Sequence, residues 1–234
     1  AGLFGCALLT TATAASAQER IAPDSVYRVS PVMGQNTDSV LFGQMWKRDH
    51  LLAKRDRSLI TIAALIASGK SDQLSGHIAR GLDNGLKPAE IGEAINQLAY
   101  YSGWPNAVSA AEVANRVFEQ RGIAPVQNSA GARVTLDPKA EAARQRTVAE
   151  TTAPFAPGLA EFTNSALFGD LWRRPDLAPR DRSLVTVAAL IAMGQPEQLS
   201  FHLNYAMDNG LTREQAGEGG THPALYPGFP RANF

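Results

Sequence analysis

Three residue types that can bind an anion and move a proton occur twice in this chain at the same spacing. The two sets are Arg57, His77 and Glu93, then Arg182, His202 and Glu218. The planar guanidinium of arginine matches a carboxylate. Histidine and carboxyl groups can transfer protons because their pKa values can lie near the working pH. Together these types could serve acid–base chemistry on a small carboxylic acid.

The two sets belong to an internal repeat, the first feature to seek in a chain of this length. Residues 41–109 recur at 167–234, and Arg55–Ala67 returns almost unchanged as Arg180–Ala192. The Gln-Leu-Ser-x-His and Asp-Asn-Gly-Leu segments recur at an offset of 125 residues. Chance does not produce such a match, so the chain contains two copies of one structural unit.

The elements that position these side chains are predicted to be helices. Residues 58–68 are apolar nearly all round, which is typical of a fully buried helix. Residues 71–83 carry apolar side chains near the spacing of one helix face, and Asn84-Gly85 is a typical C-terminal stop. Pro88 suits the first turn of the next helix.

The rest of the chain continues this pattern. In the second copy, Thr212 and Gln215 have the spacing of a capping box. The further predicted segments are a helix at 108–121, a linker at 122–136 and an approach helix at 139–150. We therefore expect an all-α tandem repeat whose two copies pack as a pseudo-dimer.

Composition excludes several classes of function. The 22 basic and 22 acidic residues give a net charge of +0, and no basic patch indicates a nucleic-acid partner. The single cysteine, Cys6, excludes an intramolecular disulfide, a CxxC redox pair and a cysteine-based zinc site. The four histidines lack a metal-binding spacing such as HExxH, so we expect no metal.

The first seventeen residues have the pattern of a secretion signal. An apolar run ends at Ala15-Ser16-Ala17, which fits the small residues before a cleavage point. A lipoprotein acceptor at Cys6 is the alternative, but the apolar run continues past it. No other stretch approaches the roughly 20 apolar residues of a membrane span. We expect a signal at 1–17 and an exported, periplasmic protein without a membrane segment, or a cytoplasmic protein if the signal interpretation fails.

The pattern from Arg55 to Ala107 resembles the carboxymuconolactone decarboxylase family. It consists of Arg-Asp-Arg-Ser-Leu-x-Thr, Gln-Leu-x-x-His, Asn-Gly-Leu and Glu-x-x-x-x-Leu-Ala-x-Tyr-x-Gly-Trp-Pro-Asn-Ala. The resemblance implies the helical fold of the alkyl hydroperoxidase D group and a homo-oligomer. It places the first repeat at 18–121 and a second, C-terminally shortened repeat at 137–234.

Relatives with peroxidase activity carry Cys-x-x-Cys-x-x-x-His. Counting back from the two histidines, the cysteine positions hold Lys70 and Gln73 in one copy, and Gln195 and Gln198 in the other. Thiol–disulfide chemistry needs an attacking and a resolving thiol. A peroxiredoxin-like oxidoreductase is therefore excluded by that mechanism.

The resemblance implies a decarboxylase. The namesake substrate is a butenolide with a carboxylate on its ring, and its unsaturated lactone carbonyl accepts the electrons left by carbon dioxide. No cofactor is then required, but the protein must bind an anion, stabilise an oxyanion and protonate carbon. We hypothesise that Arg57 holds the substrate carboxylate and that His77, oriented by Glu93, donates the proton. Arg182, His202 and Glu218 would take the same roles in the second copy.

Other interpretations of these residues stay open. His77 could cap or bridge helices, and Arg57 could form a structural ion pair with Asp56. Trp46 and Trp172 are favoured as core anchors over substrate platforms. A non-catalytic protein that binds a small molecule is the alternative function. The choice between a pocket and an oligomer interface is open for Tyr100, Tyr101 and Trp104.

The second copy departs from the pattern after Glu218. Gly219-Gly220 stand where the first copy has Ala94-Ile95, and Pro223 replaces Leu98. In a helix, each glycine costs about 1 kcal/mol against alanine and an interior proline about 3 kcal/mol. We therefore expect no regular helix after Glu218, and we expect the active site in the first copy.

Overall fold

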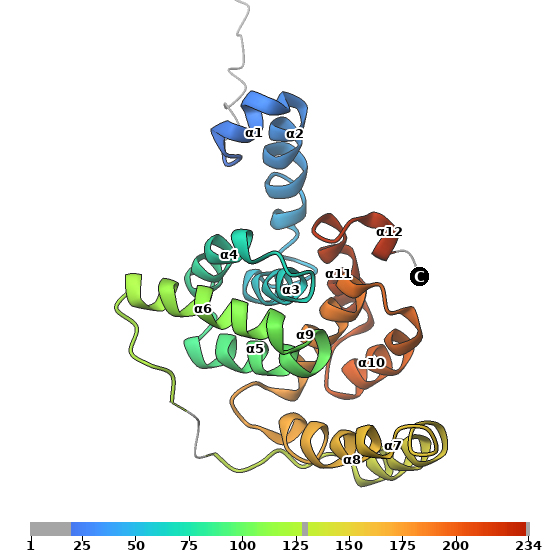
Figure 1. The fold of residues 1–234 in the computed structure, drawn as a ribbon. Coiled ribbons are helices and arrows are strands. Elements are labelled where there is room, and N and C mark those ends of the chain that lie inside the picture. The colour runs from blue at the N-terminus through green and yellow to red at the C-terminus, as the bar shows by residue number, and fades with distance from the viewer. Residues whose placement is uncertain (1–19, 128–130, 233–234) are drawn as a thin grey trace, which may run out of the picture. The chain divides into compact units, whose positions relative to one another are not determined.

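The computed structural model describes residues 20–127 and 131–232, and every regular element in them is helical (Figure 1). The chain divides into two compact units, Ala1–Lys47 and Arg48–Phe234. Both repeats contribute to the second unit. The predicted signal at 1–17 lies outside the described residues. No helix in the described ranges is long and apolar enough to cross a membrane.

The first unit contains short helices that the sequence analysis did not predict. They are α1 (Asp24–Val29), α2 (Pro31–Asn36), the π-helical turn η1 (Thr37–Phe42) and the 3-10 turn η2 (Met45–Lys47). The buried Asp38 carboxylate holds this unit together, because it accepts two backbone N–H groups and the Tyr27 hydroxyl. Trp46 is buried and stacks on Phe42.

The first copy in the second unit has four long helices. They are α3 (Lys54–Ala67), α4 (Ser71–Asp83), α5 (Pro88–Ser102) and α6 (Trp104–Gln120). The buried helix is confirmed, since α3 is buried at every position from Asp56 to Ala67. The stop after α4 is confirmed as well, with Gly85 at φ +97°, where glycine has no steric cost. Helix α6 begins earlier than predicted, directly after Gly103.

The second copy repeats this order after an approach helix. Its elements are α7 (Pro138–Thr151), α8 (Pro157–Phe162), η3 (Thr163–Leu167), η4 (Leu171–Arg173), α9 (Pro179–Met193), α10 (Pro196–Asp208), α11 (Arg213–Thr221), η5 (Pro223–Leu225) and α12 (Phe229–Ala232). The predicted approach helix and the Thr212 capping box are confirmed. The expectation of no regular helix after Glu218 is wrong, because α11 runs through both glycines. The α-helix ends at Thr221, and Pro223, whose ring cannot continue it, begins the 3-10 turn η5.

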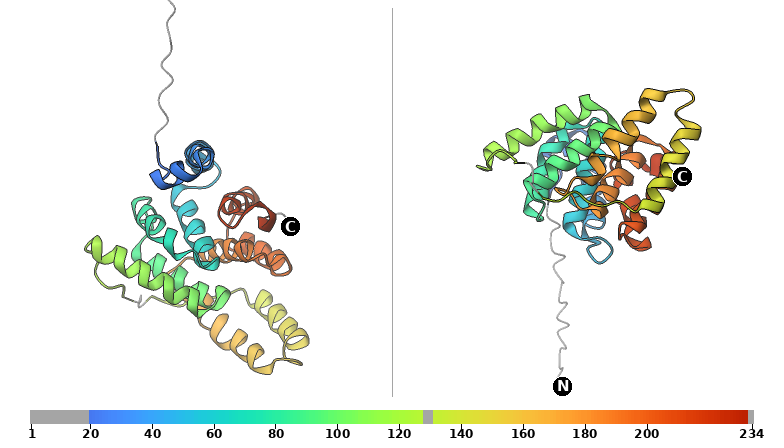
Figure 2. Two further views of the ribbon diagram at one scale, coloured as in Figure 1. Left: turned by 45° about the horizontal axis from the view of Figure 1, so that its top comes forward. Right: turned by 90° about the horizontal axis from the view of Figure 1, so that it is seen from below.

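The two copies meet where α3 packs against α9, and their helices lie side by side in Figure 2. One hydrophobic core joins them, with Leu59 and Ile62 from α3 and Leu184 and Val187 from α9 almost fully buried. Burial of each such side chain stabilises the fold by about 1.5–3 kcal/mol. This packing confirms the predicted all-α tandem.

Reciprocal ion pairs mark the pseudo-twofold relation. Arg55 donates to Asp181 and Arg180 donates to Asp56, both at 2.7 Å. The proposed ion pair between Arg57 and Asp56 is wrong, because the Asp56 carboxylate is used by Arg55 and Arg180.

Candidate active sites

The glutamate of each copy binds the arginine of the other copy. Nη2 of Arg182, on α9, lies 2.6 Å from Oε2 of Glu93, on α5, and Nη1 donates to Gln97 at 3.0 Å. Arg174 donates to the other oxygen of Glu93 at 2.9 Å. The Arg182 and Glu93 side chains are 0% and 7% exposed, so this is a buried ion pair between the copies.

The reciprocal pair joins Arg57 of the first copy to Glu218 of the second. Arg57 Nη1 lies 3.2 Å from Glu218 Oε1, and Arg48 donates to both Glu218 oxygens. The hypothesis that Glu93 orients His77 within one copy is therefore corrected, because Glu93 neutralises Arg182 and Arg174 instead.

These pairs also change the role of the arginines. Both the Arg57 and the Arg182 side chains are 0% exposed and face a carboxylate within the protein. A buried guanidinium needs such a partner, since an uncompensated buried charge is strongly destabilising. Burial lowers the pKa of both arginines, and Glu218 and Glu93 oppose that shift. The structure thus gives both arginines a structural counter-ion in place of the substrate carboxylate we expected.

Four residues after each arginine, a threonine forms hydrogen bonds both to that arginine's carbonyl and to a side chain of the other copy; we call this arrangement a threonine relay. Thr61 donates to the Arg57 carbonyl at 2.8 Å, and its oxygen lies 2.9 Å from His222 Nε2. In the other copy Thr186 donates to the Arg182 carbonyl, and Gln97 donates to Thr186 at 3.1 Å. His222 and Gln97 are counterparts at the repeat offset of 125. His222 was not among the predicted site residues, and the repeat offset pairs it with Gln97, which was not predicted either.

A tyrosine of one copy also meets the histidine of the other. His77 and Tyr226 contact edge to face at 5.3 Å between ring centroids, and so do His202 and Tyr101. We define the His202 site as His202, Tyr101 and Trp172 together with the ion-pair residues Arg182 and Glu93 and their neighbour Gln97. We define the His77 site as His77, Tyr226, His222, Arg57 and Glu218.

The composite sites reverse the argument that favoured the first copy. Glu218, His222 and Tyr226, from the irregular end of the second copy, complete the His77 site. The His202 site draws its glutamate and tyrosine from the regular helix α5. The irregular segment after Glu218 therefore contributes to the site of His77 in the first copy, and not to the site of His202 in its own copy.

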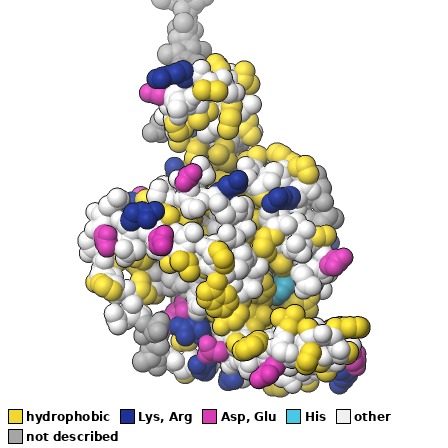
Figure 3. Space-filling model, viewed as in Figure 1, with side chains coloured by type: hydrophobic (Ala, Val, Ile, Leu, Met, Phe, Trp, Pro, Cys, Tyr) yellow, Lys and Arg dark blue, Asp and Glu magenta, His cyan; other side chains and the backbone are white. Residues whose placement is uncertain are grey.

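The His202 site opens into a cavity of about 660 Å³. Its walls are α7, α8, η3 and α10, and His202 and Tyr101 line it. Figure 3 shows a histidine among hydrophobic side chains where the α7 and α8 helices meet the rest of the unit. Of the open aromatic assignments, Tyr101 is thus a pocket residue. Trp172 is a core anchor, because it is 0% exposed and stacks behind His202 and Phe168.

The His202 imidazole is buried and lacks a partner at one nitrogen. The residue is 5% exposed, and its Nδ1 makes no hydrogen bond. Burial lowers the pKa of His202 to about 4. Burial, then Arg80, lowers the pKa of His77 to about 4. Burial, followed by Arg57 and His77, lowers the pKa of His222 to about 3. All three rings are therefore neutral at pH 7.

A hydrogen bond from Trp172 orients the Tyr101 hydroxyl so that the hydroxyl can itself act as a donor. The indole Nε1 donates to the Tyr101 hydroxyl oxygen at 3.0 Å. This leaves the Tyr101 hydroxyl hydrogen for an acceptor in the cavity, since a phenol donates one hydrogen bond. Burial raises the pKa of Tyr101, so the hydroxyl keeps its proton.

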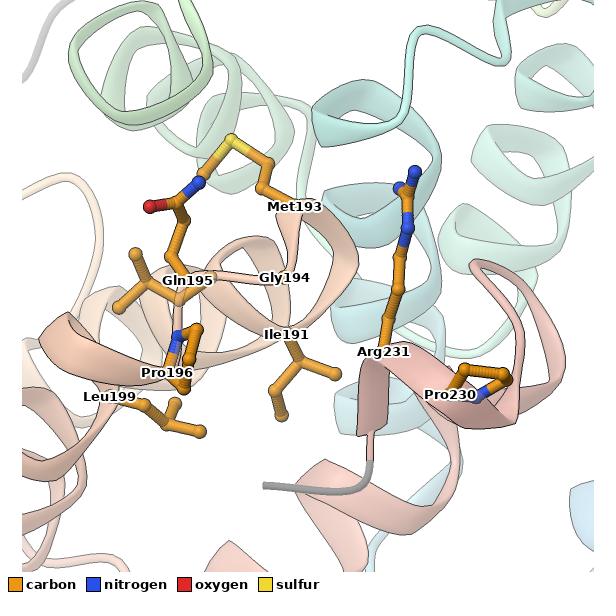
Figure 4. A pocket seen from close by; sticks show the side chains of 9 residues that line it. Ile191, Met193, Gly194, Gln195, Pro196, Leu199, Pro230 and Arg231 are labelled. Carbon is orange, nitrogen blue, oxygen red and sulfur yellow. The ribbon is translucent and has the colours of Figure 1, made fainter.

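Two other pockets differ in chemistry. One, of about 410 Å³, has Glu93 and Arg174 in its lining. Another, of about 400 Å³, lies between the α9–α10 turn and α12 (Figure 4). Its basic residue, Arg231, donates to the Ala192 carbonyl at 2.7 Å. In the first copy α6 packs over the equivalent place and leaves about 90 Å³. In the described ranges no cluster of three or more His, Cys, Asp or Glu side chains could hold a metal.

The model of the carboxymuconolactone decarboxylase family matches residues 31–116 and 157–234. The chain belongs to this family. Each matched segment contains one complete Arg-Asp-Arg motif and one of the repeat-related histidines, His77 or His202, so the family match coincides with the two copies.

Similar proteins agree with this assignment. The chain is 39% identical over 72 residues to a 4-carboxymuconolactone decarboxylase of Acinetobacter baylyi, covering 31% of this chain and 54% of that protein. It is 32% identical over 77 residues to a nitrosuccinic acid decarboxylase of Metarhizium robertsii, covering 33% and 54%. The chain thus spans about half the length of these curated relatives.

A solved structure shows the same fold. It is described as a gamma-carboxymuconolactone decarboxylase subunit from Burkholderia xenovorans, with a TM-score of 0.57 and 20% identity. The match covers 89% of this chain and 85% of that one. At this identity the likeness concerns the fold alone.

Proposed function

We propose that the protein is a cofactor-independent decarboxylase of a carboxylated lactone or a related small carboxylic acid, and that the reaction takes place at the His202 site. The observation that carries the proposal is the buried His202 imidazole in the wall of a cavity of about 660 Å³. Family membership and the two decarboxylase relatives support the reaction class.

The cavity favours loss of carbon dioxide by removing water from the substrate carboxylate. Phe168, Leu159 and Leu167 supply apolar walls, and replacement of hydration by a fixed environment can promote such a reaction. When the bond to the carboxylate carbon breaks, its electron pair moves into the ring and onto the lactone carbonyl oxygen. The Tyr101 hydroxyl, held by Trp172, donates to that developing oxyanion.

His202 carries the proton that completes the reaction. The ring is neutral at pH 7, but a negative charge beside it raises its pKa. The imidazole can then take a proton from solvent and deliver it to the carbon that lost carbon dioxide. One carboxylate and one proton are consumed, and one C–H bond and one carbon dioxide are formed, without an oxidant.

The ion pair between Glu93 and Arg182 is a positioning element in this proposal. It fixes α5, which carries Tyr101, against α9. The same observation favours a second candidate, a non-catalytic binding protein, because the two arginines are already used by glutamates.

The test is turnover of 4-carboxymuconolactone by the full chain, followed by carbon dioxide release and lactone absorbance. His202→Asn should lower kcat by roughly 10²–10⁴-fold, the usual effect of a general acid or base. The matched variant His77→Asn should retain most of the activity. If His202→Asn stays active while folded, or if only His77→Asn is inactive, the proposed site is refuted. Stabilisation by the substrate without turnover would favour the binding protein.

A further inference from the structure

We propose that the His202 cavity is built for a planar aromatic ligand with at most one carboxylate, larger than a compact carboxylated lactone. The inference rests on the proposed function for the location of the site and extends it to the class of substrate. Its basis is the set of side chains that differ between the two copies around the histidines.

Two positions of the second copy have become aromatic. Phe201 precedes His202 where the first copy has Gly76, and Tyr205 stands where the first copy has Arg80. The Phe201 and Tyr205 rings stack at 5.8 Å with an interplanar angle of 18°. Both side chains line the cavity, so these two replacements change the surface that a bound ligand would contact.

Further rings continue this wall. Phe168 lines the cavity and lies parallel to Trp172 at 5.8 Å, and Tyr205 contacts Trp172 edge to face at 5.0 Å. Aromatic pairs prefer such offset and edge-to-face geometries. A planar ring inserted beside Phe168, Phe201 and Tyr205 can adopt the same geometries, whereas a saturated ring cannot.

The charges of the cavity lining disfavour a ligand with more than one carboxylate. Arg144 is its basic side chain, lies 4.1 Å over the Phe168 ring, and is already paired with Glu141 at 2.9 Å. Asp208 adds a further negative charge to the lining. A second carboxylate on the ligand would find no uncompensated cation among these residues.

The cavity is also larger than a small lactone needs. Its volume of about 660 Å³ lies inside the roughly 300–1,000 Å³ that is typical of sites for drug-sized ligands. A neutral imidazole offers one donor and one acceptor, and the His202 side chain lines the cavity. The polar group of the ligand therefore binds at His202 while its ring occupies the aromatic wall.

The test compares two probes with nine carbons and one carboxylate each. These are trans-cinnamate, which is planar and aromatic, and 3-cyclohexylpropanoate, which is neither. Isothermal titration of the full chain should show cinnamate bound roughly tenfold more tightly, the effect of about two aromatic contacts. Equal affinities would overturn the inference.

Variants assign the preference to the cavity. Phe201→Ala and Tyr205→Arg, which restores the first-copy residue, should each reduce the preference for cinnamate several-fold. Phe155→Ala is the matched control, because Phe155 is 88% exposed and is not part of the lining. Circular dichroism melts check folding, and the half-exposed Phe201 keeps the test usable if Tyr205→Arg fails to fold. A preference unchanged by Phe201→Ala would refute the inference.

The two proposals fail separately. If cinnamate binds preferentially but no acid is turned over, the decarboxylase proposal fails and the aromatic cavity stands. If 4-carboxymuconolactone is turned over at His202 and both probes bind equally, the decarboxylase proposal stands and the aromatic cavity fails.

Discussion

The His77 and His202 sites are built from equivalent elements, but their neighbours have diverged in different ways. The His202 site takes Glu93, Gln97 and Tyr101 from a continuous helix. The His77 site takes the equivalent Glu218 from a helix that ends at Thr221, and His222 and Tyr226 from the two residues that flank the 3-10 turn η5. Because every pair crosses between the copies, a change in one copy alters the site of the other.

The two sites also differ in charge and aromatic character. Arg80 contributes to the low pKa of His77, whereas its counterpart Tyr205 belongs to the aromatic wall beside His202. His222 brings a second imidazole near His77, where the His202 site has Gln97. Duplication has thus kept the ion pairs and changed the side chains that a ligand would meet.

The largest effect expected without a substrate is the response of stability to acid, and both sites should show it. Both His77 and His202 have a pKa of about 4 in the folded chain against about 6.5 in an unfolded one. The folded state binds fewer protons between these values, so the stability is present above pH 6.5 and is lost as pH falls towards 4. At pH 5 each histidine should lower the free energy of unfolding by roughly 2 kcal/mol relative to pH 8.

Urea unfolding at pH 8 and pH 5 measures this loss. His202→Asn and His77→Asn should each reduce the difference between the two pH values by roughly 2 kcal/mol. Phe155→Ala, at an exposed position, is a control that should leave the difference unchanged. If replacement of His202 does not change the stability difference between the two pH values, the ring is not buried as a neutral group, and the description of the His202 site is wrong.

A smaller effect is expected when the sites are made alike. His222→Gln places in the His77 site the residue that the His202 site has at Gln97. Glutamine can donate to Thr61 as Gln97 donates to Thr186, so stability at pH 8 should change by less than about 1 kcal/mol. At pH 5 the variant should be the more stable protein, because an acid-sensitive imidazole has been removed. A large loss at pH 8, measured by urea unfolding, would show that the two relays are not equivalent.

The sequence predicted much of this fold because repeats and helix signals are local. The buried helix at α3, the stop at Gly85 and the capping box at Thr212 each depend on neighbouring residues. The approach helix was also predicted, within one residue at each end. The short helices of residues 24–47 were missed, because they lack a long apolar period. The glycines after Glu218 were misjudged, since tertiary packing overrides propensities of about 1 kcal/mol.

The candidate residues were found, but not their partners. Arg57, His77, Glu93 and their counterparts all lie at the two sites. The sequence could not show that Glu93 binds Arg182 rather than serving its own copy, because a repeat fixes positions within a unit and not the way two units pack. His222 was missed for the same reason, since its role arises only against Thr61 of the other copy.

A double-mutant cycle tests the central claim, that each site is assembled from both copies. The free energy of unfolding is measured for Glu93→Gln, Arg182→Met and the double variant, and for Glu218→Gln with Arg182→Met as the within-copy control. The account predicts a coupling above about 1 kcal/mol for Glu93 with Arg182, and additivity within about 0.5 kcal/mol for Glu218 with Arg182, which share no partner. Coupling of Arg182 to Glu218 and not to Glu93 would contradict the composite sites.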